Sequence, residues 1–464
     1  MPATAETRSP SLERRLNVWH ATSIVAGTII GSGIFLVPAE MMQAVGSAGL
    51  VYLAWIVGGL LSFFGALTYA ELGAVRPYAG GEYVYVRDAY GPLAGFLYGW
   101  TWFLIAKPGS IATVTSGLVR VLGTFPAFSF LPHAIFVWHV TSSRTLSVNY
   151  GHLVAIAAAG LITALNYVGV RKAGNFQFAF TVLKVVMIVG IALVALAASS
   201  GSWSNFGTTF AGAKGGIAGF MASLVAALWA YDGWNDLNMV SEEIERPEKT
   251  IPFALIAGVG LVAVLYMGLN AGVQRALPAG AIANAAVPAA AASEAALGHW
   301  GVLLVSIGMI VSMLATLNGT IMSGGRVPFA VARDGYLFKA LGEVHPKFHT
   351  PGLALVIQCL VAVVLIVVGG AFRELFSLTI FAEWLFYVVA ASTIFVFRKR
   401  EPEETRPYRT VGYPLVPAVF IVTAAVLLCY TFLDNLKDSI AGVVVILLGI
   451  PVYLWFARRK AAAR

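Results

Sequence analysis

Two short stretches place glycines and acids where continuous apolar helices are expected. Residues 27–35 read GTIIGSGIF, and residues 229–236 read WAYDGWND. Glycine costs about 1 kcal/mol per position inside a helix, so closely spaced glycines favour local unwinding. Unwound backbone inside a bilayer is tolerated only where protein or a water-filled cavity satisfies its polar groups. Acids at membrane depth, here Asp232 and Asp236, are costly and mark functional sites.

A helix interrupted midway can bind a zwitterion. It exposes unpaired N–H groups with partial positive charge where its second half begins, and unpaired carbonyls where its first half ends. A carboxylate suits the N–H groups, an ammonium suits the carbonyls, and an amino acid carries both. For the first stretch alone, close helix packing through Gly27 and Gly31, a GxxxG pair, explains the glycines equally well. Asp232 and Asp236 favour a binding site, because packing glycines do not require them.

Lys184 is the most unusual charge in the sequence. It lies nine residues past Asn175, about 14 Å into an apolar run. Such a lysine is deprotonated, or its ammonium is held by carbonyls and hydroxyls, or it reaches a water-filled vestibule without a role.

Three further polar residues lie within apolar runs and leave alternatives open. Lys107, before Pro108, is expected at a helix kink or vestibule in preference to a substrate contact. Glu383 is expected to be a buried acid bonded to backbone in preference to a proton carrier. Asn318 is either a pocket residue or a partner of Lys184.

The composition excludes an ordinary soluble protein. Apolar residues make up 59% of the 464 residues and charged residues 11%, whereas soluble domains carry about 25% charged residues. The fold class is an all-α polytopic membrane protein, not a soluble enzyme or a nucleic-acid-binding protein. Twelve transmembrane helices are expected, near residues 18–43, 46–74, 92–123, 150–170, 176–200, 216–240, 252–275, 300–332, 353–370, 374–397, 414–433 and 439–457.

Lysine and arginine predict the orientation. With both termini cytoplasmic, 21 of the 30 basic residues fall inside and 6 fall outside or at the outer rim, as the positive-inside rule requires. We therefore expect a cell inner (plasma) membrane protein with a cytoplasmic tail over residues 1–15. Residues 276–299 predict short helices or a loop on the outer face, and residues 76–92 an interfacial segment.

The two interrupted runs occupy corresponding positions in two halves. The first run passes outward and the sixth inward, as in inverted five-helix repeats whose broken helices surround a midplane site. The expected organisation is a first repeat over 16–200, a second over 216–398, and two extra helices over 414–458. Neither a nucleophile–base pair nor a metal-ligand spacing is found, so we expect no enzyme activity, no metal and no cofactor.

The sequence resembles the amino acid–polyamine–organocation (APC) superfamily, and within it the L-type amino acid transporter group and its bacterial exchangers. The resemblance spans about residues 17 to 430. The stretches that carry it are GTIIGSGIF (27–35), PYAGGEYVYVRDAY (77–90), residues 166–174 with Lys184, WAYDGWNDLN (229–238), EEIERPEKTIP (242–252), and residues 318–335 followed by His345-Pro346.

The resemblance implies a fold and a set of site residues. The fold is a 5+5 inverted repeat with broken helices 1 and 6. Backbone at Ser32 and Gly33 would hold the substrate carboxylate, and carbonyls around Ile29, Trp229 and Asp232 the α-amino group. Trp229 would be the aromatic gate, where the family has phenylalanine. The substrate-binding residues implied are Ile29, Gly31, Ser32, Gly33, Trp229, Ala230 and Asp232.

The resemblance also bears on coupling. Lys184 stands where sodium-coupled relatives bind sodium, so its ammonium would replace the cation, with Tyr266 and Asn318 nearby. This implies a sodium-independent exchanger of small neutral L-amino acids that works by alternating access. The alternative is a proton-coupled symporter with Lys184 as the proton-linked switch. Animal relatives are tethered to a heavy subunit through a cysteine between spans three and four. Residues 124–149 contain no cysteine, so no covalent heavy subunit is expected.

Overall fold

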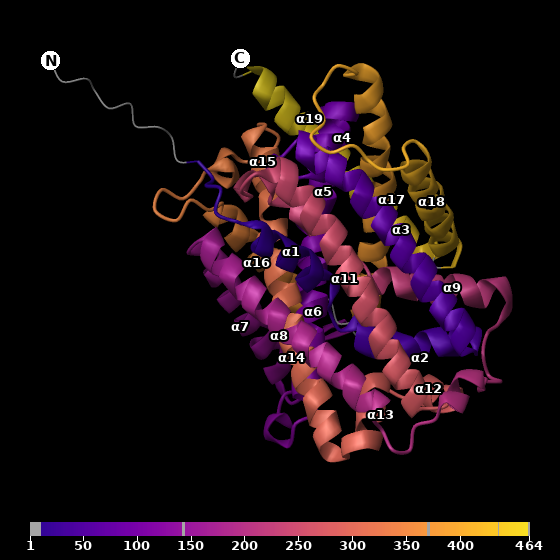
Figure 1. The fold of residues 1–464 in the computed structure, drawn as a ribbon. Coiled ribbons are helices and arrows are strands. Elements are labelled where there is room, and N and C mark those ends of the chain that lie inside the picture. Colours follow the sequence, from indigo (N-terminus) through magenta and orange to yellow (C-terminus); the bar gives the residue numbers. More distant parts are fainter. Residues whose placement is uncertain (1–10, 142–143, 369–371, 435, 463–464) are drawn as a thin grey trace.

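The computed structural model describes residues 11–141, 144–368, 372–434 and 436–462, which fold into a bundle of helices (Figure 1). Among the described residues, eight helical segments are long and apolar enough to cross a membrane, and two shorter apolar helices join them. This confirms a mainly helical membrane protein. The expected N-terminal tail, residues 1–15, lies outside the described residues as far as residue 10.

The α-helices are, in chain order, α1 (Val18–Ile29), α2 (Gly33–Val45), α3 (Ala48–Val75), α4 (Glu82–Tyr90), α5 (Pro92–Thr101), α6 (Lys107–Leu122), α7 (Tyr150–Tyr167), α8 (Val170–Leu196), α9 (Gly216–Ala230), α10 (Asp236–Met239), α11 (Pro247–Ala276), α12 (Ala279–Asn284), α13 (Pro288–Leu297), α14 (His299–Gly324), α15 (Arg326–Arg333), α16 (Gly352–Val368), α17 (Phe372–Arg400), α18 (Leu415–Asp434) and α19 (Leu436–Ala462). Short helical turns lie at η1 (Trp102–Ala106), η2 (Pro126–Phe128), η3 (Trp203–Gly207), η4 (Ser241–Glu243) and η5 (Lys339–Gly342).

Both glycine-bearing runs are interrupted where the sequence predicts. The first breaks after Ile29, and the chain turns through Ile30 to Ser32 before α2 begins. The second breaks after Ala230, and α10 begins at Asp236 after a five-residue turn that contains Gly233. Gly233 has φ +105°, a conformation that L side chains rarely adopt, and an added Cβ would lie 2.9 Å from Thr28. Glycine is therefore required at this turn.

A third irregularity lies between α5 and α6. The chain forms one π-helical turn, η1, directly before Lys107 and Pro108. Such bulges are frequent at functional sites. The expected irregularity at Lys107 is confirmed.

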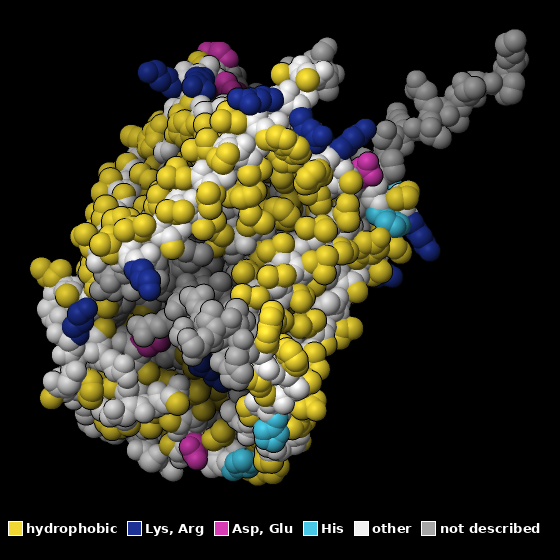
Figure 2. All heavy atoms as spheres, turned by 180° about the vertical axis from the view of Figure 1, so that it is seen from behind, with side chains coloured by type: hydrophobic (Ala, Val, Ile, Leu, Met, Phe, Trp, Pro, Cys, Tyr) yellow, Lys and Arg dark blue, Asp and Glu magenta, His cyan; other side chains and the backbone are white. Residues whose placement is uncertain are grey.

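The first and last described segments of the chain lie at the same end of the bundle, here called the terminal end (Figure 1). Leu16 pairs with Ile244, and Lys460 Nζ donates to the Asp334 carbonyl at 2.6 Å. Figure 2 shows several Lys and Arg side chains gathered at this end and hydrophobic side chains over the middle of the molecule. The opposite end carries α12 and α13, which confirms short helices within residues 276–299.

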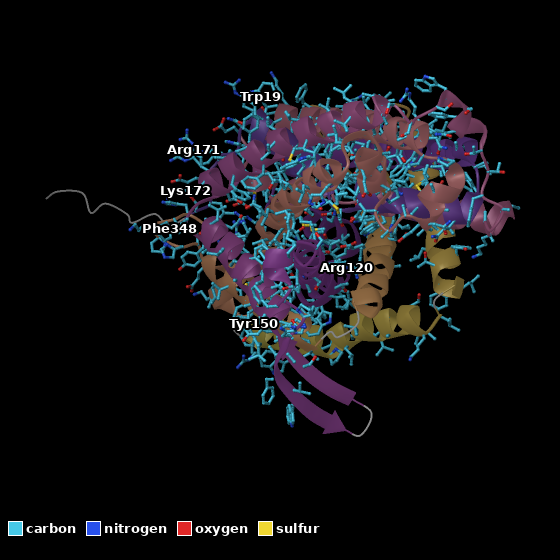
Figure 3. All side chains as sticks on the ribbon, turned by 90° about the horizontal axis from the view of Figure 1, so that it is seen from below. Trp19, Arg120, Tyr150, Arg171, Lys172 and Phe348 are labelled. Atoms are coloured by element: carbon cyan, nitrogen blue, oxygen red, sulfur yellow. The ribbon has the colours of Figure 1, made fainter. Side chains whose placement is uncertain are left out.

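Two segments differ from the sequence-based expectation. The interfacial prediction for residues 76–92 is wrong over α4, because Glu82, Tyr83 and Tyr85 are buried against protein. In addition, two strands, β1 (Ala134–Thr141) and β2 (Arg144–Asn149), pair antiparallel as a hairpin, so the fold is not purely α. The hairpin extends sideways from the bundle next to Tyr150 (Figure 3).

Candidate functional site

A cavity of about 600 Å³ lies between the two helix breaks and the end opposite the chain termini. Its deep part is lined by the backbone breaks and by charged residues, and its mouth by residues near the α12–α13 segment such as Val287 and Ala290. Arg120 also lines the mouth, and it lies within the bundle in Figure 3, whereas Trp19, Lys172 and Phe348 lie at the rim. The cavity therefore opens toward one end of the bundle.

The first break lines this cavity with backbone. Ile29, Gly31, Ser32 and Gly33 are all lining residues. Ser32 and Gly33 begin α2, whose first N–H groups have no partner within the helix and carry partial positive charge. This end of α2 can accept an anionic group.

The second break lies against the first. Trp229, Ala230 and Asp232 also line the cavity. A Cβ added at Gly33 would lie 3.3 Å from the Ala230 Cα and 3.3 Å from the Trp229 ring. The structure thus brings together all seven substrate-binding residues that the resemblance implied.

The two glycines of the GxxxG pair have different environments. A Cβ at Gly27 would lie 2.3 Å from Thr181 Oγ1 and 2.4 Å from Gln177 Nε2 on α8, so Gly27 is a packing glycine. A Cβ at Gly31 would meet its nearest atom, Thr316 Oγ1, at 3.7 Å, and Gly31 faces the cavity. Gly27 therefore serves the packing of α1 against α8, and Gly31 belongs to the cavity wall.

Tyr266 joins the two breaks. Its hydroxyl lies 2.8 Å from the Ala230 carbonyl and 3.2 Å from the Ile29 carbonyl. The Ile29 carbonyl also accepts the Gly31 N–H at 2.8 Å. A carbonyl has two lone pairs, and the Ile29 carbonyl already has two donors in this conformation.

Lys184 is buried with its ammonium surrounded by carbonyls. Its Nζ donates to the Ile30, Gly27 and Ser312 carbonyls at 2.7, 2.8 and 3.1 Å. Two of these carbonyls belong to the end of α1, and the third to α14. Of the alternatives left open by the sequence, the structure shows the carbonyl-held amine.

Two hydroxyls of α14 complete this cluster. Ser312 Oγ donates to the Ile30 carbonyl at 2.7 Å, and Thr316 Oγ1 lies 3.1 Å from the same carbonyl. Neither residue was singled out from the sequence. Their signal is the spacing of Ser312, Thr316 and Thr320, which puts polar side chains on one face of an apolar helix.

Asn318 is not a partner of Lys184, which corrects the expectation from the sequence. Its amide donates to Gln177 Oε1 at 2.7 Å and to the Ala173 carbonyl at 3.1 Å, and it accepts from Asn166 at 2.9 Å. It does not line the cavity. The physical reason is helical geometry, because residues two apart on α14 do not share a face, and Asn318 is two from Thr316.

The floor of the cavity is charged. Lys107 forms a buried ion pair with Asp236, which joins α6 to the start of α10. Asp232 accepts from the Tyr387 hydroxyl at 2.7 Å, and the same hydroxyl lies 3.1 Å from Asn235 Oδ1. Lys107 is thus a cavity residue with a fixed acidic partner, in addition to its position at a helix irregularity.

Below the floor, α4 closes the terminal end. Glu82 accepts from Asn235 at 2.7 Å and from Tyr98 at 3.2 Å. Burial raises the pKa of Glu82 to about 7, although the hydrogen bond from Asn235 opposes this shift. Arg326 makes two bonds to Glu243, at 2.7 and 3.0 Å, with both side chains fully buried. This buried ion pair joins η4 to α15 at the terminal end.

Glu383 lies at the floor, and its carboxyl group has no partner among the described residues. Its side chain is 7% exposed and lines the cavity near Asp232 and Lys107. Within the described residues its carboxyl group makes neither a hydrogen bond nor an ion pair. The described residues thus show no backbone partner for Glu383, and its role stays a prediction.

Comparisons with known proteins agree with this geometry. A family model described as amino acid permease matches residues 16–456. The chain is 31% identical to the serine/threonine exchanger SteT of Bacillus subtilis (strain 168), over 98% of this chain and 100% of that protein. It is 30% identical to the human cystine/glutamate transporter (96% and 85% covered) and to the mouse Asc-type amino acid transporter 1 (98% and 84% covered).

The match covers nearly the whole chain, including both helix breaks and Lys184. Its relatives are amino acid exchangers and transporters, which agrees with a cavity between interrupted helices. The chain therefore belongs to the amino acid permease family of the amino acid–polyamine–organocation superfamily, a family of transporters.

Proposed function

We propose that this protein is a sodium-independent exchanger of small neutral L-amino acids. The observation that carries the proposal is that a helix N-terminus at Ser32 and Gly33 and a helix C-terminus at Trp229 and Ala230 face one cavity. One end suits a carboxylate and the other an ammonium. The two charged groups of an amino acid would thus be held by backbone alone.

In this proposal the substrate carboxylate lies at the N–H groups of Ser32 and Gly33. The α-amino group lies at carbonyls around Trp229 and Asp232, because the Ile29 carbonyl already has two donors. The Trp229 ring, which lies against the Gly33 position, is the gate over the substrate.

Sodium independence is supported by the Lys184 contacts. The amine holds three carbonyls between α1 and α14, a set of oxygens that would otherwise suit a small cation. A fixed ammonium at this position removes the need for a bound ion. The Tyr266 hydroxyl donates to a carbonyl of each helix break, Ile29 and Ala230, and so stabilises the breaks relative to each other.

We propose twelve spans with residues 16–200 and 216–398 as inverted repeats and residues 414–458 as two extra helices. Both termini are cytoplasmic in a plasma membrane, and the cavity mouth faces outward. Alternating access then requires the contacts at the terminal end, such as Arg326 with Glu243 and Asn235 with Glu82, to separate when the protein opens inward.

Exchange and small neutral substrates are supported by the relatives. One is a serine/threonine exchanger, and another is an Asc-type amino acid transporter. The absence of cysteine from residues 124–149 supports function without a covalent heavy subunit.

The test is uptake of labelled amino acid into proteoliposomes. Vesicles preloaded with the same amino acid should accumulate label many times faster than empty vesicles, equally in sodium and in potassium buffers. A requirement for sodium would overturn sodium independence. Equal uptake by empty vesicles under an imposed proton gradient would overturn exchange.

The second outcome would favour a proton-coupled symporter, with Lys184 as the proton-linked switch. One observation supports this alternative, namely the raised pKa of buried Glu82, about 7, beside Asn235 at the closed end. A group of this kind gains or loses a proton near neutral pH when its surroundings change. Uptake by empty vesicles with and without a pH gradient separates the two mechanisms.

A further inference from the structure

We propose that Glu383 is the acceptor that recognises the substrate side chain, and that the preferred substrates carry an O–H or N–H donor on a neutral side chain. This inference rests on the proposed function and names the substrate class within it. It begins from the observation that Glu383 lines the cavity and is only 7% exposed, yet its carboxyl group has no hydrogen-bond partner in the described part of the chain.

The other acids at the floor are already engaged by protein. Asp236 is held by Lys107 through Oδ1, and Asp232 accepts from the Tyr387 hydroxyl at 2.7 Å. The other oxygen of Asp236, Oδ2, is fully buried without a partner among the described residues, so it is closed to a ligand. Glu383 lines the cavity and is not among these fully buried unpaired groups, so a donor that enters the cavity can reach its carboxyl group.

The position of Glu383 suits a side-chain contact more than a contact to the amino acid backbone. The helix breaks at Gly33 and Ala230 supply the groups for the carboxylate and the amine. Glu383 comes from another helix, α17, and lies beside Asp232 and Lys107 at the floor. A substrate held by its α-groups at the breaks would direct its side chain toward the remaining wall.

The donor is neutral because the proposed function is exchange of neutral amino acids, and because Lys107 already supplies an ammonium to these acids. Lys107 lies beside the same acids and is paired with Asp236. A second ammonium would have to be desolvated next to this lysine, whereas a hydroxyl or amide adds no charge. Serine, threonine and asparagine fit this description, and hydrocarbon side chains leave the carboxyl group unpaired.

The experiment compares near-isosteric substrates in proteoliposomes. Threonine differs from valine by a hydroxyl in place of a methyl, and asparagine has nearly the shape of leucine. We expect threonine and asparagine to exchange with transport efficiencies about tenfold or more above their partners, because a site with a buried polar group rejects a ligand that leaves it unpaired. In Glu383→Leu the threonine-to-valine ratio should fall to about 1.

Two variants keep the result interpretable. Glu383→Gln retains an acceptor oxygen and should keep most of the preference for threonine. Glu294→Leu removes an exposed carboxyl group on α13, outside the cavity, and should leave the ratio unchanged. If Glu383→Leu fails to fold, the ratio in wild type and in Glu383→Gln still tests the proposal.

The outcomes separate this inference from the function on which it rests. Exchange of threonine and valine with equal efficiency in wild type, or an unchanged ratio in Glu383→Leu, would overturn the role of Glu383 alone. A higher efficiency for 2,4-diaminobutyrate than for threonine would overturn the neutral substrate class. Absence of exchange with every amino acid would overturn the proposed function itself.

Discussion

Lys184 holds three backbone carbonyls with a single amine. Its ammonium accounts for one lone pair on each of three carbonyls, two at the end of α1 and one on α14. Ser312 and Thr316 donate to the same region, so the broken end of α1 has its carbonyls satisfied without water. An amine buried this deeply is stable only because these oxygens surround it.

Lys184→Ala should abolish or strongly reduce exchange while the protein still folds. Removal of the amine takes one hydrogen bond from each of three buried carbonyls, at a cost of about 0.5–1.5 kcal/mol per bond, which should shift the end of α1 from its position at the cavity. Exchange rate and thermal stability in detergent are measured together. Lys172→Ala, an exposed lysine on the same helix (Figure 3), is the matched control and should behave as wild type. Unchanged exchange kinetics in Lys184→Ala would remove this residue from the mechanism.

At the scale of elements, the breaks were predictable and their surroundings were not. Glycine and acid within apolar runs have few explanations in a bilayer, so Gly31, Gly33 and Asp232 could be assigned to a site from the sequence. The ends of the long helices also agree closely. For example, the seventh run, predicted over 252–275, is α11, Pro247–Ala276.

The sequence-based predictions fail where they depend on the direction in which a side chain points. Position along a helix gives the depth of a residue but not the side of the helix on which it lies. Asn318 and Thr316 lie at similar depth, yet only Thr316 faces the end of α1. The buried position of Glu82 depends on Asn235, 153 residues away, which no local pattern reveals. The hairpin was missed because Ile135 to Trp138 are consecutive apolar residues without the alternation of a half-buried strand.

Gly27→Ala should destabilise the pair formed by α1 and α8. The added methyl group would lie 2.3 Å from Thr181 Oγ1 and 2.4 Å from Gln177 Nε2, so these side chains must move. Overpacking of this kind costs about 1–3 kcal/mol, which should lower the melting temperature of the purified protein. Gly190→Ala, on α8 with open space around it, is the control and should not lower the melting temperature. Equal melting temperatures for both variants would contradict the packing role of Gly27.

The whole molecule combines a cavity open to one end with a closed opposite end. The mouth lies near α12 and α13, and the closed end is held by α4, η4 and α15. Loops from both halves of the chain meet there, since Asp334 bonds to Tyr83 of α4 at 2.6 Å and accepts from Lys460 of α19. Opening of this end therefore has to separate contacts that several elements share.

The attachment of Lys184 to the chain has an electrical consequence. A soluble ion at this site would cross the membrane with the substrate and move charge in every cycle, whereas an ammonium on α8 stays with the protein. Exchange of one neutral amino acid for another would then transfer no net charge. We expect exchange rates that do not change when a potassium gradient with valinomycin imposes a potential of either sign, although each elementary charge moved across 100 mV would represent about 2.3 kcal/mol. A steep dependence on potential would mean that a charge accompanies the substrate.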